Sequence, residues 1–325
     1  MSAETVSTWG AAVRGVGVEF REFFTQNTLA ETKGWEPVVQ YVTDDASVAT
    51  FSGKTGAGKA TRYAEGAAIP KASRYKLYDT AFTHDSYGGQ LEITERQLLN
   101  REFNDAFDEF KDLTIAQNVA LSEAPAQIFN GGFANSGIFT NRGYRITTYA
   151  DGKNIFSTAH PRVDGGSAQS NASSTGIPLT ETNFETGRIA LAEQLQDDGT
   201  PIANMGNVYV VVPLALEKTG QIVTGSMLRS GTANNDINVY TGGGYTVMSS
   251  VWLGSVNGGS NTAWFLVAPS VAGLQLIRRT GPMMDQSVDK NTKSTLFDVH
   301  SWFSAGSKRW HGTWASKGDS LAYSS

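Results

Sequence analysis

Apolar side chains recur every three or four residues from Thr94 to Ala124, and this spacing predicts one long amphipathic helix. Its apolar stripe consists of Leu99, Phe103, Phe107, Phe110, Leu113 and Ala120, interrupted only by the polar Gln117. Thr94 is in position to cap the helix, with Gln97 at the capping-box position. We expect Pro125 to bound the helix, ahead of a stop signal at residues 130–133. About 30 residues at 1.5 Å each make a rod of roughly 45 Å, whereas the mean helix has about 11 to 12 residues.

The segment before this helix, residues 53–79, has a different character. It holds few large aliphatic side chains, and Gly66 and Pro70 break any helix within it. A polar segment of this length is unusual inside a compact domain and is usually functional or flexible. We interpret it as a two-stranded hairpin that projects from the body and, being marginal alone in water, needs a partner surface. Alternating polarity at residues 77–83 and 90–93 predicts the half-buried strands that join it to the helix.

These two features carry opposite charges. The projecting segment has six bases, Lys54, Lys59, Arg62, Lys71, Arg74 and Lys76, against the two acids Glu65 and Asp79, a net charge of +4. The helix has three bases, Arg96, Arg101 and Lys111, against seven acids, Glu95, Glu102, Asp105, Asp108, Glu109, Asp112 and Glu123, a net charge of −4. Two solvated faces would explain these charges. The alternative hypothesis is that the basic segment of one copy lies over the acidic helix of its neighbour, where complementary fields set the register.

The alternative hypothesis defines candidate inter-subunit contacts. They are the six bases named above and the acids Glu102, Asp105, Asp108, Glu109 and Asp112. Near the N-terminus, Phe20, Phe23 and Phe24 recur at helical spacing, and we interpret residues 1–45 as an arm that docks onto another surface. These three phenylalanines complete the set. A long projecting hairpin followed by a long rigid helix suits a protein that reaches across neighbours more than one with a compact pocket.

Downstream, the pattern predicts further helices and strands. A second helix is expected at residues 181–196, with Thr182 and Glu185 as its capping box. The β-branched run at 208–212 predicts a buried strand, and a short helix follows at 213–223, because its proline suits the first helical position. Other strands are expected at 237–240, 245–253, 264–267, 274–277 and 296–314.

Composition is typical of a folded, globular protein. With 325 residues, of which 40% are hydrophobic and 18% charged, the chain is long enough for two folded regions plus extensions. The absence of cysteine excludes disulfides, thiolate nucleophiles and cysteine metal ligands. The net charge of −5 argues against duplex nucleic acid binding as the main task, because neutralising phosphates requires a basic surplus.

No targeting segment is evident in the sequence. The first residues form neither a basic n-region nor an apolar h-region. The longest apolar runs are far below the roughly 18 residues needed to span a bilayer. We therefore expect a soluble protein that stays in the cytoplasm where it is made and has no membrane partner.

Candidate catalytic motifs are incomplete. Residues 53–60 resemble a phosphate-binding P-loop, but Ala60 stands where the motif requires Ser or Thr for Mg²⁺, so a glycine-rich loop tip is the favoured interpretation. The histidines at 84, 160, 300 and 311 show no metal-ligand spacing. His160 lies near Asp151 and Asp164, but no Gly-x-Ser-x-Gly elbow supplies a nucleophile, so we expect His160 to be hydrogen-bonded at a turn. We predict that the protein is not an enzyme and has no catalytic, cofactor-binding or metal-binding residues.

The order of these features resembles a known family. A basic extended loop containing Ala-Glu-Gly-Ala-Ala-Ile-Pro at 64–70, a strand, an acidic long helix and Ile-Phe-Asn-Gly at 128–131 are similar to tailed-bacteriophage major capsid proteins of the Hong Kong 97 type. The runs at 156–161, 182–185 and 210–218 resemble the Mu-like major head subunit branch. The likeness covers most of the chain from about residue 50.

The resemblance implies an α+β capsid fold in five segments. They are an N-terminal arm (1–45), an extended loop hairpin (46–90), a peripheral domain with a long spine helix (91–199), an axial domain (200–272) and the peripheral domain's C-terminal strands (273–325). It implies a major capsid protein, a structural component of the virion, that self-assembles as pentamers and hexamers into an icosahedral shell. The shell would enclose phage double-stranded DNA without sequence-specific binding. Scaffold and portal proteins are further expected partners, no cofactor is expected, and assembly is expected in the host bacterial cytoplasm.

Two rival functions remain open at this point. An encapsulin-like compartment would keep the fold but hold protein cargo. A β-rich virion decoration or carbohydrate-binding protein would use some of the seven tryptophans to stack on sugars, although packing in cores and interfaces is their commoner use.

Overall fold

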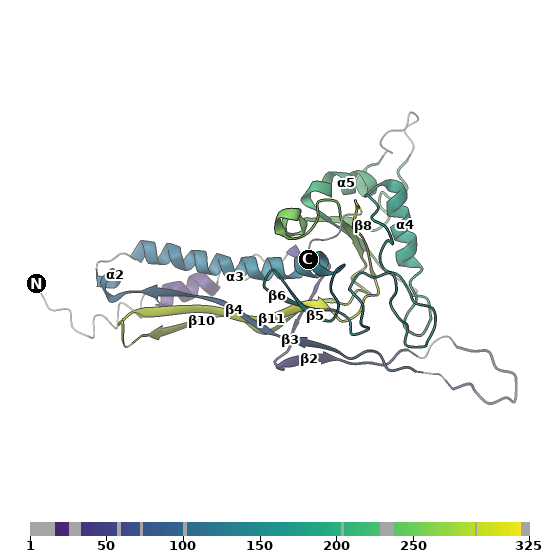
Figure 1. The fold of residues 1–325 in the computed structure, drawn as a ribbon, viewed down its shortest axis with the longest axis horizontal. Helices are drawn as coiled ribbons and strands as arrows, with labels where there is room; N and C mark the ends of the chain where they lie inside the picture. The colour runs from purple at the N-terminus through teal and green to yellow at the C-terminus, as the bar shows by residue number, and fades with distance from the viewer. Residues whose placement is uncertain are drawn as a thin grey trace, which may run out of the picture.

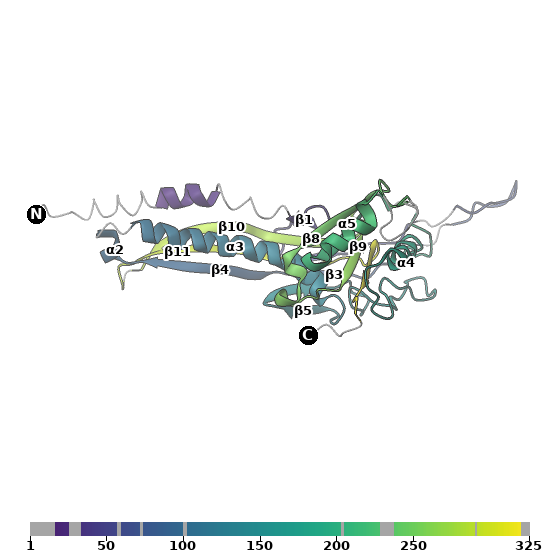
Figure 2. The same cartoon turned by 90° about the horizontal axis from the view of Figure 1, so that it is seen from above.

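The computed structural model describes residues 17–25, 34–56, 60–71, 74–99, 103–202, 205–227, 237–289 and 291–319. The molecule is elongated: a long helix lies along a long sheet at one end, and a second sheet with its own helices stands at the other (Figures 1 and 2). A narrow hairpin projects beyond the second sheet (Figure 1). Residues 17–25 form an N-terminal helix that runs beside the long helix (Figure 2).

The long sheet is built around two antiparallel strands, β10 (Leu274–Val288) and β11 (Thr295–Ser307). Its other strands are β1 (Gln40–Thr43), β4 (Asp85–Ile93), β5 (Ile138–Asn141) and β6 (Tyr144–Thr147). The order is β1-β10-β11-β6-β5, and β4 pairs antiparallel with β11. Alternate β11 side chains, including Phe297, Val299 and Phe303, are buried, so the alternation read from the sequence is confirmed.

The long helix is confirmed, with a different end. Its capping box forms as predicted: the Thr94 N–H donates to Gln97 Oε1 at 2.9 Å, and the Gln97 N–H donates to Thr94 Oγ1 at 3.3 Å. The short helix α2 (Glu95–Leu99) follows this cap, and α3 (Phe103–Gly131) packs on β4, β10 and β11. Pro125 lies inside α3 and does not bound it.

Packing explains why α3 continues past a proline, which costs a helix roughly 3 kcal/mol in its interior. Ala124, Ala126, Ile128 and Phe129 are all fully buried, and burying their apolar surface opposes that cost. The helix then ends at Gly131, where the stop signal is. The polar interruption of the stripe, Gln117, is also buried and donates a hydrogen bond to Ser301 Oγ.

The second sheet has the order β12-β9-β7-β8. Its strands are β7 (Val208–Pro213), β8 (Tyr245–Ser250), β9 (Trp264–Val267) and β12 (Thr313–Ser316). Helix α4 (Glu181–Ala192) packs on β9 and β12, while α5 (Glu217–Gly225) packs on β7 and β8. Short 3-10 helices follow β7 and β8, namely η2 (Leu214–Leu216), η3 (Val251–Leu253) and η4 (Ser255–Asn257). Strand β9 has the same bounds as the strand predicted at 264–267, so that prediction is confirmed.

One hydrophobic core joins the two sheets. Phe129, near the end of α3, meets Phe265 of β9 edge to face, with ring centroids 5.1 Å apart. Trp35 stacks on the same Phe129 ring, with centroids 5.5 Å apart. The end of the spine helix and one face of the second sheet therefore share a core, while the other face of that sheet forms a separate core with α4 and α5.

The projecting hairpin starts from a short two-stranded sheet, β2 (Val48–Phe51) and β3 (Thr80–Thr83). Pairing continues outward: the Leu77 N–H donates to Gly53 O at 2.9 Å, and the Thr55 N–H donates to Tyr75 O at 2.8 Å. Residues 60–71 have no regular secondary structure and are exposed throughout. The run 53–56, expected at a loop tip, instead lies at the hairpin root, and no helix follows it among residues 60–71.

Two predictions for α4 are wrong. The cap is Thr180 and not Thr182, because Thr180 has extended backbone angles and its hydroxyl accepts the Asn183 N–H at 3.2 Å. Glu185 does not close a capping box; its carboxylate binds Arg188. The helix ends at Ala192, four residues earlier than position 196, because Gln194 turns to donate to Thr313 O at 2.8 Å.

The predicted strand at 237–240 is also wrong. Asn238 forms a turn: its side chain donates to Val223 O at 2.9 Å and accepts the Tyr240 N–H at 3.0 Å. Ile237 and Val239 are exposed, so these apolar residues do not form the buried face of a strand. Conversely, β10 runs eleven residues past the expected end at 277, to Val288, because β11 pairs with it along the whole length.

Candidate assembly surfaces

The basic surface is the hairpin. Among the described residues, Lys54, Arg62, Lys71, Arg74 and Lys76 are all exposed on it, while Lys59 lies outside them. Lys76 Nζ lies 2.5 Å from Asp79 Oδ2, but such an exposed pair contributes little to stability. In the described part of the hairpin, Lys54, Arg62, Lys71 and Arg74 form no ion pair and can meet a partner of opposite charge.

The acidic surface is the first half of α3. Asp108, Glu109 and Asp112 are exposed there, and Lys111 pairs with Asp108 at 2.8 Å. Glu102 lies outside the described residues; Asp105 lies within α3, but its side chain is also outside them. The exposed Ile115 extends this surface by one turn.

One acid of the helix does not belong to this surface. Glu123 is buried, 2.9 Å from Arg142 Nε, and accepts a hydrogen bond from Tyr144 at 3.2 Å. Burial and the neighbouring Glu123 carboxylate raise the pKa of Tyr144, which stays a hydrogen-bond donor. The helix therefore presents less negative charge to solvent than its sequence indicates.

The N-terminal phenylalanines pack on their own chain. Phe20 stacks on Phe110 with ring centroids 4.4 Å apart, and Phe23 meets Phe107 edge to face at 5.3 Å. Phe20 and Phe24 are buried, which leaves them no exposed area for a neighbour. The spacing correctly indicated a docking helix, but the surface that receives it is α3 of the same chain and not the expected second subunit.

The two charged surfaces lie far apart within one chain. The hairpin projects from one end of the molecule, and the first turns of α3 lie at the opposite end in both views (Figures 1 and 2). The hairpin of a chain therefore cannot reach the acidic half of its own helix.

The histidine that suggested catalysis has a structural role. His160 is 1% exposed; its Nδ1 lies 2.6 Å from Asp151 Oδ2 and its Nε2 lies 3.0 Å from Asn171 Oδ1. Its ring stacks on Trp310 at 4.5 Å. Both ring nitrogens are used in this closed arrangement, so His160 cannot serve as a base for a nucleophile.

Most tryptophans in the described residues pack inside the protein. Trp35, Trp264, Trp310 and Trp314 are buried, and the exposed ring of Trp302 lies under the Arg279 guanidinium at 4.7 Å. In the part of the chain that the structure describes, no three His, Asp or Glu side chains gather as a metal site. None of the helices described is both long and apolar enough to cross a membrane.

A body with buried cores of its own, an exposed long hairpin and opposite charges at its two ends suits a subunit that contacts copies of itself. The family model for phage capsid protein matches residues 77–315, and this chain belongs to that family. It is thus a structural building block of a bacteriophage capsid, a component of the virion. No curated protein matches it in sequence.

Solved capsids share the fold at low sequence identity. The capsid of a native GTA particle is 12% identical, with a TM-score of 0.53 over 88% of this chain and 90% of that one. Mycobacterium phage Patience is 11% identical, with a TM-score of 0.52 over 98% of this chain and 88% of that one. The capsid of bacteriophage JBD30 decorated with minor capsid protein trimers is 14% identical, with a TM-score of 0.51 over 68% and 91%. The predicted Hong Kong 97-type capsid fold is confirmed.

Proposed function

We propose that copies of this protein join as the pentamers and hexamers of an icosahedral phage head, with the basic hairpin of one copy lying on the acidic face of α3 in the next. The observation that supports this contact is the separation of the two surfaces at opposite ends of the chain (Figures 1 and 2). Hairpin residues 60–71 are exposed along their whole length, and a hairpin alone is marginal in water. A neighbouring copy supplies the surface that the hairpin lacks.

The contact acts through complementary charge fields more than through individual ion pairs. Charges on exposed side chains are screened over about 8 to 10 Å at physiological salt, so each pair contributes modestly. Several bases facing Asp108, Glu109 and Asp112 together set the register and speed encounter. Assembly should therefore weaken as salt rises.

A charge-swap experiment tests the contact directly. Asp108→Lys with Asp112→Lys places like charges under the hairpin, and we expect shell formation to fall at least about tenfold at low salt, because like-charge contacts cost several kcal/mol across an interface. Adding Lys71→Glu and Arg74→Glu to the same chain restores opposite charges and should recover shells. Sedimentation and negative-stain microscopy measure the assembled fraction.

The matched control is Glu193→Lys, an exposed acid near the end of α4. It changes the net charge in the same direction without touching α3, so assembly should stay at the wild-type level. If the variant with the two α3 substitutions assembles like wild type, or if adding the two hairpin substitutions does not recover shells, the hairpin does not contact this face of α3.

The finer assignments rest on the sequence resemblance. We propose that the chain belongs to the Mu-like branch, with an arm (1–45), loop (46–90), peripheral segments (91–199 and 273–325) and an axial domain (200–272). Its shell encloses double-stranded DNA without reading sequence, assembles in the host bacterial cytoplasm, and works with a scaffold and a portal protein. Nuclease-resistant DNA in particles from infected cells supports this proposal, whereas particles that hold only protein support an encapsulin-like compartment.

A further inference from the structure

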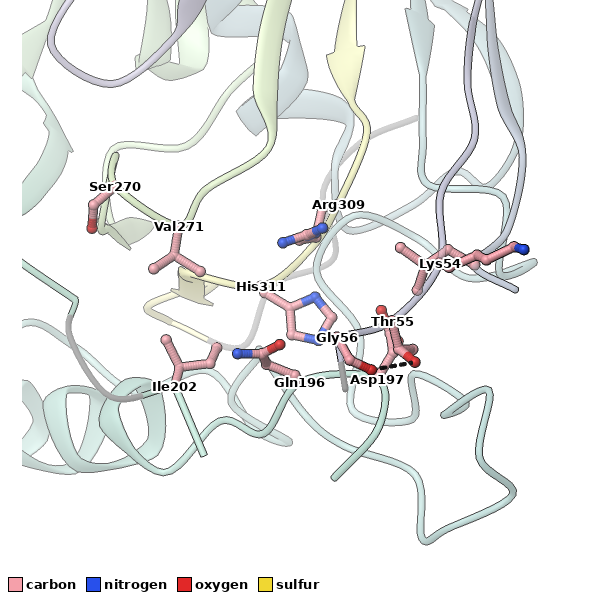
Figure 3. A pocket seen from close by; sticks show the side chains of 11 residues that line it. Lys54, Thr55, Gly56, Gln196, Asp197, Ile202, Ser270, Val271, Arg309 and His311 are labelled. Atoms are coloured by element: carbon pink, nitrogen blue, oxygen red, sulfur yellow. Dashed lines mark hydrogen bonds between the residues drawn. The ribbon is translucent and has the colours of Figure 1, made fainter. Parts of the chain in front are cut away.

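A pocket of about 210 Å³ lies under the root of the hairpin (Figure 3). Four distant parts of the chain form its walls: hairpin residues 54–56 with 77, the turn at 196–202, residues 270–271, and residues 309–311. No sequence motif links these segments, so the pocket could not be predicted from the sequence. Its interior is polar, and two of its buried side chains have unpaired atoms.

His311 is the first of these side chains. It is 2% exposed, and neither ring nitrogen has a hydrogen-bond partner of ordinary geometry among the described residues. Burial, Arg309 and His160 lower the pKa of His311 to about 3, which the Leu195 backbone opposes only weakly. The ring is therefore neutral near pH 7, with one N–H to donate and one lone pair.

Asp197 is the second. It is 4% exposed, and its Oδ1 lacks an ordinary hydrogen-bond partner in the described part of the chain. Burial raises the pKa of Asp197 to about 6, although the charge of Arg309 opposes the rise. Buried polar atoms are nearly always paired in folded proteins, so these two groups indicate a missing partner: an acceptor for the His311 N–H and, while the Asp197 carboxyl holds its proton, an acceptor for that proton as well.

Arg309 supplies the charge of the pocket. Its guanidinium extends between Val271 and His311, while the ammonium of Lys54 points away (Figure 3). No described residue forms an ion pair with Arg309. The side chain of exposed Gln196 lies on the opposite side of His311, with its amide oxygen nearer the ring and its amide nitrogen turned toward Ile202 (Figure 3). A guanidinium, a buried imidazole ring and an amide thus line one polar space.

We propose that this pocket binds a carboxylate group, supplied either by a small carboxylate in solution or by an acidic side chain of another copy. The planar guanidinium of Arg309 offers two parallel N–H groups, which match the two oxygens of a carboxylate. The His311 N–H and the Gln196 amide can donate to the remaining lone pairs. One cation suits a single negative charge better than a phosphate dianion, and the neighbouring Asp197 has to hold its proton, because an ionised Asp197 would repel the bound carboxylate. Because hairpin residues form part of the wall, a bound carboxylate ties the hairpin root to the body.

Acetate binding tests the proposal on unassembled full-length protein. At pH 5.5, where Asp197 is largely protonated, and at constant ionic strength with chloride as the replacement anion, acetate should raise the midpoint of thermal unfolding and give a saturable calorimetric signal. Arg309→Gln should weaken acetate binding about tenfold or more, because charge-assisted hydrogen bonds to the guanidinium are lost. The matched control is Arg279→Gln, which removes an arginine that lies over Trp302 and should leave acetate binding unchanged.

Shell assembly separates the two sources of the carboxylate. If an acidic side chain of another copy occupies the pocket, Arg309→Gln lowers assembly and acetate inhibits assembly of the wild type. If a free carboxylate is the ligand, Arg309→Gln loses acetate binding but assembles normally. If acetate does not bind and Arg309→Gln assembles like wild type, the pocket holds only water and the proposal is wrong. The charge-swap variants of α3 change none of these acetate measurements, so the two proposals can fail independently.

Discussion

At the scale of single residues, two buried groups at the hairpin root make stability depend on pH in opposite ways. The pKa of Asp197 rises from 3.8 to about 6 on folding, through burial and the nearby Asp151 and Asp198, so the folded chain holds that proton more tightly. Its contribution is fully present below pH 3.8 and is lost as pH rises through 6. The pKa of His311 falls from 6.5 to about 3, so its contribution is present above pH 6.5 and is lost as pH falls toward 3.

Asp197→Asn should isolate the first of these contributions. The variant cannot titrate at this position, so the free energy of unfolding of wild type minus that of the variant should fall by roughly 1 to 3 kcal/mol between pH 4 and pH 7. Urea unfolding of the unassembled protein at both pH values measures this difference. Asp112→Asn, on the exposed face of α3, is the matched control. If the free energy of unfolding of wild type minus that of Asp197→Asn is the same at pH 4 and pH 7, folding does not raise the pKa of Asp197.

At the scale of elements, the structure attaches the N-terminal helix to α3 through one aromatic cluster. Phe20 is 2% exposed and contacts Phe107, Phe110 and Phe297, whereas Val18 on the same helix is 58% exposed. Few other side chains of residues 17–25 are buried. The attachment of this helix therefore depends strongly on Phe20.

Phe20→Ala should release the helix without unfolding the body. Truncating a buried phenylalanine costs about 3 to 5 kcal/mol, more than a short helix gains from its remaining contacts. Hydrogen exchange at residues 17–25 should approach that of an unprotected segment, while β7 and β9 keep their protection. Val18→Ala should change neither. Unchanged protection in Phe20→Ala would show that other contacts hold the helix.

Elements with local signals could be predicted from the sequence, and those decided by distant contacts could not. The Thr94–Gln97 capping box and strand β9 depend on residues adjacent in sequence, and both form as expected. Pro125 inside α3 is tolerated because other parts of the chain bury the residues around it. The charges of the two surfaces could be predicted from residue type. The burial of Glu123 could not be predicted, because it depends on the distant Arg142. The pocket at the hairpin root was unpredictable for the same reason, since four distant segments form it.

At the scale of the whole molecule, the chain divides into a body that is complete by itself and a hairpin that is not. One core joins the spine helix to the second sheet, so the body gains its stability from contacts within the chain. Residues 60–71 bury no side chain against that body. The fold therefore separates the residues that stabilise a subunit from those that connect subunits.

Replacing residues 60–71 with a short Gly-Ser linker should separate folding from assembly. The removed side chains are all exposed, and shortening a flexible loop changes its closure entropy little, so the free energy of unfolding should stay within about 1 kcal/mol of wild type. Shells should nevertheless not form, because the hairpin then cannot reach a neighbour. Thermal unfolding of the subunit and sedimentation of the assembly reaction measure the two quantities. In a second variant, Gly and Ser replace residues 60–71 at the original length, except that Arg62 and Lys71 are kept. Partial recovery of shells in this variant would show that the contact depends on the charge of the hairpin as well as on its length. Normal shells from the shortened chain would show that this family member assembles without its hairpin.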